Sequence, residues 1–229
     1  MSVLQFLNIG RPQDLSMNMG FTAEDEDGVS CFLTANGIEA GSKFAVVAPM
    51  STWVTRNWPA KRYAEIADSI SAELGLPIIL IGSKREHDAV ATISDLMSTK
   101  PVIAAGVFKF REVAALIASA SILLGGDSGP MHVAGAVGTP YVAVFGSTPI
   151  DGRQPLVGQG QAVSFAVPCG PCDWHQCSNK QNPLVCLESI QVSEVLAAVK
   201  SILELPNCPH VLVGSDRQLR GAPLSLLKQ

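Results

Sequence analysis

The segment Ile122–Thr148 reads ILLGGDSGPMHVAGAVGTPYVAVFGST and carries the clearest structural pattern in the chain. Its apolar residues predict one buried strand at Ile122–Leu124 and a second at Tyr141–Phe145. Between them lies a short helix that Pro130 opens and Gly138 closes. Proline suits a first helical position, because the N–H group it lacks would be unpaired there, and glycine suits a helix exit. The stretch therefore predicts a strand–turn–helix–strand unit of a parallel sheet.

The turn before this helix is suited to anions. The backbone N–H groups of Gly129, Met131 and His132 are expected to point out of the carboxyl edge of the sheet. Together with the helix dipole, such groups form a site that suits phosphate. A buried helix with a structural histidine at position 132 explains the same residues equally well, so both interpretations stand at this point.

A family resemblance extends over these residues. The run D-S-G-P-M-H-V-A-G-A-V-G-T-P at 127–140, followed by an apolar strand and F-G-S-T-P, resembles the signature of glycosyltransferase family 9, the lipopolysaccharide heptosyltransferases. The resemblance implies a GT-B architecture of two Rossmann-like halves, with this signature in the C-terminal half that holds the ADP-sugar donor. Relatives move heptose from ADP-heptose onto the lipopolysaccharide inner core at the cytoplasmic membrane face.

The rest of the chain repeats the pattern of a parallel sheet. Further apolar strands are predicted at 44–48, 78–81 and 102–105, and helices at 59–74, 85–97 and 111–120. Five short, continuously apolar strands alternating with four helices specify an α/β, Rossmann-like parallel sheet covered by helices on both faces. Its ligands are expected beyond the carboxyl ends of the strands. A strand at 162–167 and a helix at 192–203 follow.

The resemblance suggests three segments. Residues 1–42 resemble the end of the N-terminal half and its connector, residues 43–205 form the nucleotide-sugar-binding domain, and 206–229 form a C-terminal tail. The first segment contains an acidic run at 24–27 with an Asp-x-Asp pair, Asp25 and Asp27. Such a pair holds a divalent cation in metal-dependent glycosyltransferases of the other major fold. Because no apolar strand leads into it, we predict a solvated loop.

Composition limits the partners. The 229 residues are 47% hydrophobic and carry a formal net charge of −4, with basic residues scattered along the chain. A nucleic-acid surface would need clustered Lys and Arg, so no such partner is expected. No apolar run reaches the ~20 residues that span a bilayer, and the first residues lack the basic start of a secretory signal. We expect a cytoplasmic protein that can associate peripherally with the inner membrane.

Several residues match donor-binding positions of the family. Ser51 and Thr52 match a hydroxyl pair that meets the donor diphosphate, and Arg56 stands where the family has lysine. Arginine keeps the charge and can grip phosphate with two N–H groups, but its planar fork differs from a point ammonium. A surface cation beside a helix start is the alternative for Arg56.

The signature supplies further donor contacts. Asp127 is assigned to sugar or ribose hydroxyls or to capping the turn, while Ser128, Gly129, Met131 and His132 are assigned to the phosphate and donor sugar. Glu112 opens the helix before the signature strand and either reaches the nucleotide ribose, as acidic residues do in relatives, or stabilises its own helix N-terminus.

A cluster of cysteines follows the predicted sheet: Cys169, Cys172, Cys177 and Cys186. Their density is compatible with a structural zinc site, although only one CxxC pair is present. Reduced thiols packed in a loop are the other interpretation, and disulfides are disfavoured in a cytoplasmic setting. Relatives often carry similar cysteines in this loop.

No catalytic residue is assigned within this chain. In the family the general base is an Asp near the start of the N-terminal half, and residues 1–42 leave no room for that half. The chain thus resembles the C-terminal 60% of a member. We expect an inverting transferase domain that binds ADP-heptose without a metal cofactor. The lipopolysaccharide acceptor would be held by the missing half or by a partner chain. A nucleotide-sugar-binding module without catalysis, or a truncated product, is the alternative.

Overall fold

A six-stranded parallel sheet forms the centre of the computed structural model, which describes Met17 and residues 19–205. The strand order is β3–β2–β1–β4–β5–β6, and every neighbouring pair is parallel. The strands are β1 (Ala45–Ala48), β2 (Ile78–Leu80), β3 (Val102–Ile103), β4 (Ile122–Gly126), β5 (Tyr141–Phe145) and β6 (Gly160–Ser164). This order is that of a Rossmann-like sheet, which confirms the predicted fold class.

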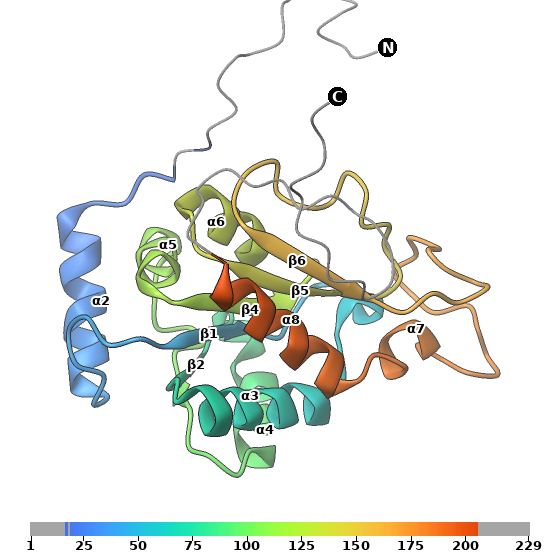
Figure 1. Cartoon of the computed structure of the whole chain (residues 1–229), viewed down its shortest axis with the longest axis horizontal. Helices are drawn as coiled ribbons and strands as arrows, with labels where there is room; N and C mark the ends of the chain where they lie inside the picture. The colour runs from blue at the N-terminus through green and yellow to red at the C-terminus, as the bar shows by residue number, and fades with distance from the viewer. Residues whose placement is uncertain (1–16, 18, 206–229) are drawn as a thin grey trace, which may run out of the picture.

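Helices cover both faces of this sheet (Figure 1). The helices α3 (Ala60–Leu74), α4 (His87–Leu96), α7 (Val185–Glu188) and α8 (Val192–Glu204) contribute to one apolar core. The helices α2 (Ala23–Ala35), α5 (Phe110–Ser119) and α6 (Gly129–Val137) contribute to the other. Two short 3-10 turns, η1 (Val54–Arg56) and η2 (Lys84–Glu86), complete the set of named elements.

The two cores follow from the side-chain alternation of the strands. In β1, Ala45 and Val47 belong to the core under α3, while Val46 and Ala48 belong to the core under α5 and α6. All four residues of β1 are buried, as are all five of β5. Strands buried on both faces must be apolar throughout, which explains why the sequence shows continuous apolar runs instead of alternation.

The helix exits agree with the sequence prediction. Gly75 ends α3 with a φ of 66°, and Gly138 ends α6 with a φ of 81°. Both lie in the left-handed region, where a side chain is unfavourable. The predicted 85–97 helix is divided into η2 and α4, and β6 begins two residues before the predicted strand. An added Cβ on Gly160 would lie 1.9 Å from the Tyr141 ring, so β6 starts at a residue without a side chain.

The prediction of a solvated loop for the acidic run at 24–27 is wrong, because this run forms the first turn of α2. Thr22 caps the helix: its backbone N–H donates to Asp25 Oδ2 at 2.8 Å, and its hydroxyl accepts from the Asp25 amide. The Thr22 amide and the Thr22 hydroxyl, which also donates to Asp25 Oδ2 at 2.8 Å, hold the pKa of Asp25 below its ordinary value. Asp25 also pairs with Arg111 of α5 at 3.3 Å. The Thr-x-x-Asp spacing, a capping box, was the overlooked signal.

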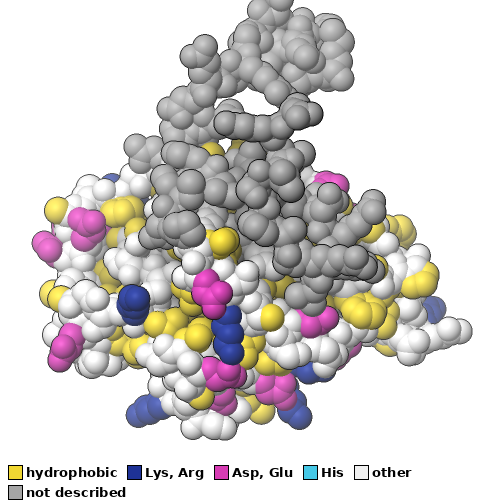
Figure 2. All heavy atoms as spheres, viewed as in Figure 1, with side chains coloured by type: hydrophobic (Ala, Val, Ile, Leu, Met, Phe, Trp, Pro, Cys, Tyr) yellow, Lys and Arg dark blue, Asp and Glu magenta, His cyan; other side chains and the backbone are white. Residues whose placement is uncertain are grey.

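The face of the molecule drawn in Figure 2 carries charged side chains of both signs. On the face drawn in Figure 2, Lys and Arg side chains are interspersed with Asp and Glu and form no continuous basic area among the coloured residues. Within residues 17 and 19–205, no helix has both the length and the apolarity needed to cross a bilayer. The predicted tail at 206–229 lies outside the described residues, and the proposed division into segments stays a prediction.

Candidate functional site

The candidate site lies where the strand order reverses. β1 and β4 are neighbours, with Ala48 paired to Gly125, although α3, β2, α4, β3 and α5 lie between them in the chain. The loop after β1 and the turn after β4 therefore leave the sheet side by side at its carboxyl edge. In open α/β sheets, ligands bind at such a switch point.

Two glycines at the end of β4 allow these segments to approach closely. A Cβ on Gly125 would lie 2.9 Å from the Ala48 carbonyl oxygen, and one on Gly126 would lie 3.0 Å from the Arg56 carbonyl oxygen. Contacts this short require the backbone to shift. The Gly125–Gly126 pair thus permits η1 to lie against the end of β4.

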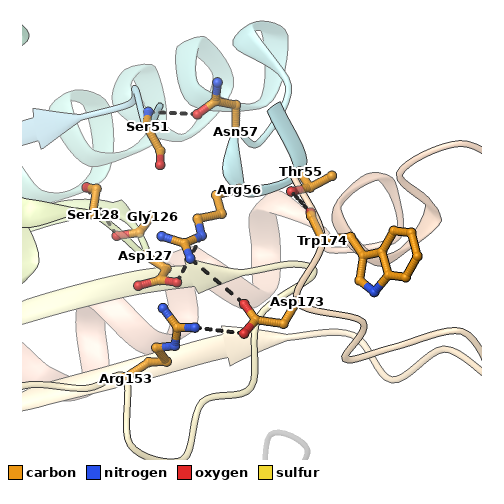
Figure 3. Close-up of polar contacts among 10 residues, drawn as sticks. All are labelled: Ser51, Thr55, Arg56, Asn57, Gly126, Asp127, Ser128, Arg153, Asp173 and Trp174. Atoms are coloured by element: carbon orange, nitrogen blue, oxygen red, sulfur yellow. Dashed lines mark hydrogen bonds and ion pairs between the residues drawn. The ribbon is translucent and has the colours of Figure 1, made fainter. Parts of the chain in front are cut away.

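Arg56 is held by its surroundings. Its Nε lies 3.3 Å from Asp127 Oδ2 (Figure 3). Its Cζ lies 3.6 Å from the centre of a Trp53 ring. The Arg56 and Asp127 side chains are only 12% and 5% exposed. The alternative of a surface cation is therefore wrong. The buried Arg56 Nε and Nη2 and Asp127 Oδ2 nevertheless lack well-aligned hydrogen bonds.

The turn after β4 leads directly into α6. Ser128 is the N-cap residue, its hydroxyl donates to the Gly126 carbonyl at 3.4 Å, and Gly129 is exposed. His132 is exposed on the first turns of α6, so the interpretation as a buried structural histidine is wrong. An exposed helix start of this kind is a position where proteins bind anions.

The assignment of the Met131 amide to the anion site needs correction. Its N–H donates to the Ser128 carbonyl at 3.2 Å, because the first turn of α6 closes with a bond to the third preceding residue. The Met131 side chain is fully buried in the core. Met131 thus stabilises the helix start and does not present its N–H group to a ligand in this conformation.

The hydroxyl pair after β1 lies on the same loop as Arg56. Ser51 is half-buried and Thr52 is exposed, and the Ser51 amide donates to Asn57 Oδ1 at 2.7 Å. Asn57 closes the loop across η1 and was not singled out by sequence. Its side chain fixes the direction of the Ser51–Thr52 segment.

Glu112 has a capping function. Its Oε2 accepts a hydrogen bond from the Lys109 amide at 2.7 Å, which completes a capping box at the start of α5. Glu112 therefore stabilises the N-terminus of its own helix, which is one of the two functions considered from sequence. The other, a contact with the nucleotide ribose, stays a prediction; α5 begins at the same edge of the sheet as the site.

A loop after β6 packs against the site. Thr55 Oγ1 donates to the Trp174 carbonyl at 2.6 Å, and the Asp173 amide donates to the Ser147 carbonyl at 2.7 Å. The His175 ring stacks on Trp53, with their ring centres 3.6 Å apart. Asp173, Trp174 and His175 were not assigned to the site from sequence. Each is placed by a contact whose two partners are more than 25 residues apart in the chain.

The four cysteines line one small cavity together with Thr55 and Ser147. The Leu184 amide points at Cys177 Sγ at 3.3 Å, and all four cysteines are free thiols. Burial raises the pKa of the Cys186 thiol. Within the part of the chain that the structure describes, no three His, Cys, Asp or Glu side chains converge as metal ligands. The arrangement is that of packed thiols, and the zinc site stays a prediction without support from this geometry.

Comparisons with known proteins identify the family of this chain. A profile described as glycosyltransferase family 9 (heptosyltransferase) matches residues 8–182. Lipopolysaccharide heptosyltransferase 3 of Escherichia coli is 32% identical over 111 residues, which are 47% of this chain and 32% of that protein. The matched segment thus spans about a third of this curated relative.

Solved structures show the same fold. A family 9 glycosyl transferase from Veillonella parvula superposes with a TM-score of 0.76 at 23% identity, covering 88% of this chain and 57% of that one. The E. coli ADP-heptose lipopolysaccharide heptosyltransferase II gives a TM-score of 0.68 at 22% identity, covering 84% and 55%. With the profile match over more than half of its length, the chain belongs to glycosyltransferase family 9.

Proposed function

We propose that this chain binds the nucleoside-diphosphate-sugar donor of a heptosyltransferase, with ADP-heptose as the donor and the lipopolysaccharide core as the acceptor. The observation that carries this proposal is the meeting of Arg56, Asp127 and the start of α6 at the β1–β4 switch point. An arginine beside a helix N-terminus supplies two sources of positive potential for a diphosphate. The named E. coli relatives support the choice of ADP-heptose.

The proposed chemistry is inverting transfer with departure of the donor diphosphate. Preorganised donors aimed at the leaving group stabilise the charge that develops there, so Arg56, the hydroxyls of Ser51, Thr52 and Ser128, and the Gly129 amide would fill this function. We propose that this set replaces a divalent cation. Asp127, held by Arg56, is then placed to accept hydrogen bonds from donor-sugar hydroxyls.

Transfer also requires deprotonation of the acceptor hydroxyl. A positioned base typically contributes ~10²- to 10⁴-fold, and acceptor positioning contributes more. We propose that the base and the acceptor site come from an N-terminal half or a partner chain, at the cytoplasmic membrane face. If no such half joins this chain, the proposal reduces to a nucleotide-sugar-binding module.

The experiment measures ADP release from ADP-heptose in the presence of a core-lipid acceptor. The polypeptide of these 229 residues is tested alone and with a co-expressed N-terminal half of a family member. We expect donor binding with negligible turnover in the first case and measurable transfer in the second. Robust turnover by the 229 residues alone would contradict the assignment of the base to another polypeptide segment.

A further inference from the structure

One carboxylate lies between two arginines at the edge of the site. Asp173 Oδ2 accepts a hydrogen bond from Arg153 Nη2 at 2.8 Å, and Asp173 Oδ1 lies 3.9 Å from Arg56 Nη2 (Figure 3). Because both oxygens belong to the same carboxylate, the two guanidinium groups face each other across it. Arg153 comes from the loop between β5 and β6, and Asp173 from the loop after β6.

The backbone holds Asp173 in this place. Its φ is +51°, a left-handed conformation that is unfavourable for most non-glycine residues and that Asp and Asn tolerate best. The Asp173 amide donates to the Ser147 carbonyl, and the next carbonyl, of Trp174, accepts from Thr55 Oγ1. Both bonds join the loop to segments of the candidate site, so the carboxylate is aimed at the arginines by long-range contacts.

The charges of this group cancel. Arg56 and Arg153 bear two positive charges, and Asp127 and Asp173 bear two negative charges. Of the two carboxylates, Asp127 is 5% exposed and Asp173 is 41% exposed. Only Asp173 can be displaced without carrying a buried charge through the core. Two arginines that share one anion are the geometry in which proteins hold phosphate.

The loop that carries Arg153 also has polar atoms without partners. Ser147 Oγ and Thr148 Oγ1 are buried and make no hydrogen bond, although their residues are only 2% and 3% exposed. Buried hydroxyls without a partner are rare in folded proteins. Such hydroxyls, a few residues before Arg153, are a second indication that this loop faces a ligand.

We propose that Arg153 is a second phosphate-binding arginine of the donor site, and that Asp173 is an internal anion which occupies the phosphate position until a nucleoside diphosphate displaces it. This inference rests on the proposed function, because it takes the ligand to be a donor diphosphate. It assigns opposite effects to the two residues. Arg153 strengthens binding of the diphosphate, and Asp173 weakens binding by competing for the same guanidinium groups.

The test is calorimetry of the full 229-residue chain with ADP and with inorganic pyrophosphate, and with adenosine as the phosphate-free comparison. Asp173→Asn should bind ADP and pyrophosphate about 3- to 10-fold more tightly, since it removes one competing charge at the site. Asparagine suits the left-handed backbone, so the loop keeps its conformation. Arg153→Gln should bind both about 5- to 20-fold more weakly. Neither change should alter adenosine binding.

Matched controls remove the same charges elsewhere. Lys43 lies before β1 and Asp95 lies at the end of α4, both at the amino edge of the sheet. Lys43→Gln and Asp95→Asn should leave the affinities for ADP and pyrophosphate unchanged. Thermal melting checks whether Asp173→Asn is as stable as the wild type. If it is not, Asp173→Ser replaces it in the binding measurement. Unchanged or weaker ADP binding by the folded Asp173 variant overturns the inference, as does wild-type affinity in Arg153→Gln.

The outcomes separate this inference from the proposed function. If the wild-type chain binds ADP and neither substitution changes the affinity, the inference alone fails. If the wild type binds neither ADP nor pyrophosphate but Asp173→Asn binds pyrophosphate, the inference stands and the donor assignment fails. If no variant binds either ligand, both fail.

Discussion

Arg56 Nε and Asp127 Oδ2 lie 3.3 Å apart in a site where both side chains are largely buried. The pair joins the loop after β1 to the turn after β4, two segments that meet only because β1 and β4 are neighbours in the sheet. Trp53 covers the guanidinium at 3.6 Å. A buried, stacked arginine with a fixed carboxylate is preorganised and loses little side-chain entropy when a ligand binds.

Arg56→Ala should weaken ADP binding by about 1.5–3 kcal/mol, the range for a charge-assisted hydrogen bond. The change also leaves the buried Asp127 carboxylate without its cation. Arg56→Lys keeps the charge but loses the stacking on Trp53 and the planar fork, so we expect an intermediate affinity. Calorimetry measures both variants, and unchanged affinity in Arg56→Ala would show that the arginine has only a structural function.

Gly126→Ala should disturb the site through the backbone. The added Cβ would lie 3.0 Å from the Arg56 carbonyl oxygen, so η1 must move away from the end of β4. We expect the free energy of unfolding to fall by about 1–3 kcal/mol, as for other overpacked positions, together with weaker ADP binding. Gly20→Ala is the control, because its Cβ would meet no atom within 4 Å. Equal urea midpoints for the two variants would contradict the close approach.

Asp68 should make the free energy of unfolding depend on pH in the acidic range. Partial burial alone would raise the pKa of this carboxyl, but hydrogen bonds from the Ser98 amide and from the Thr99 amide and hydroxyl, at 2.6–2.8 Å, lower it below its ordinary value. A lowered pKa stabilises the fold above the unfolded value of about 3.9, and this contribution is lost as the pH falls through the folded value.

Asp68→Asn should therefore reduce the free energy of unfolding by about 1–2 kcal/mol at pH 7 and flatten its decline below pH 4. The measurement is urea unfolding at a series of pH values. Asp95→Asn, at an exposed position of α4, serves as the matched control. Parallel pH curves for wild type and Asp68→Asn would contradict the assignment.

The cysteine loop should behave as packed, reduced thiols. Cys169 and Cys177 are exposed, whereas Cys186 is half-buried and burial raises the pKa of its thiol. Since the thiolate is the reactive form, alkylation followed by mass spectrometry should modify Cys169 and Cys177 first and Cys186 last. A chelator should not change this order. About one zinc per chain, with all four cysteines protected until the metal is removed, would support the zinc site instead.

Much of the fold was predictable because buried parallel strands and their glycine-capped helices leave local patterns. The apolar run at Tyr141–Phe145 and Gly138 before it gave the bounds of β5 and the exit of α6 as the structure has them. The start of α2 was missed because its acidic first turn was judged by charge, while Thr22 and Asp25 formed a capping box. The Met131 amide was misassigned because the closure of one helical turn depends on local geometry that the sequence does not specify.

The site was only partly predictable for a physical reason. Arg56 and Asp127 could be named because the resemblance to the family matched them to donor-binding positions, and the shared carboxyl edge of parallel strands explains why the two segments meet. Arg153 and Asp173 lie in irregular loops, where no periodicity indicates direction. Their positions depend on contacts such as the bond from the Asp173 amide to the Ser147 carbonyl, which only the folded chain reveals.

Calorimetry of ADP binding tests the proposed diphosphate site, with the wild-type chain and Arg56→Ala each measured in excess chelator and in Mg²⁺. We expect wild-type binding of equal strength under both conditions, and binding about 10- to 150-fold weaker in Arg56→Ala, because the arginine and the start of α6 supply the positive charge. Wild-type binding only with Mg²⁺, or equal affinity in the two proteins, would contradict the claim that Arg56 and the β4–α6 turn hold the donor diphosphate.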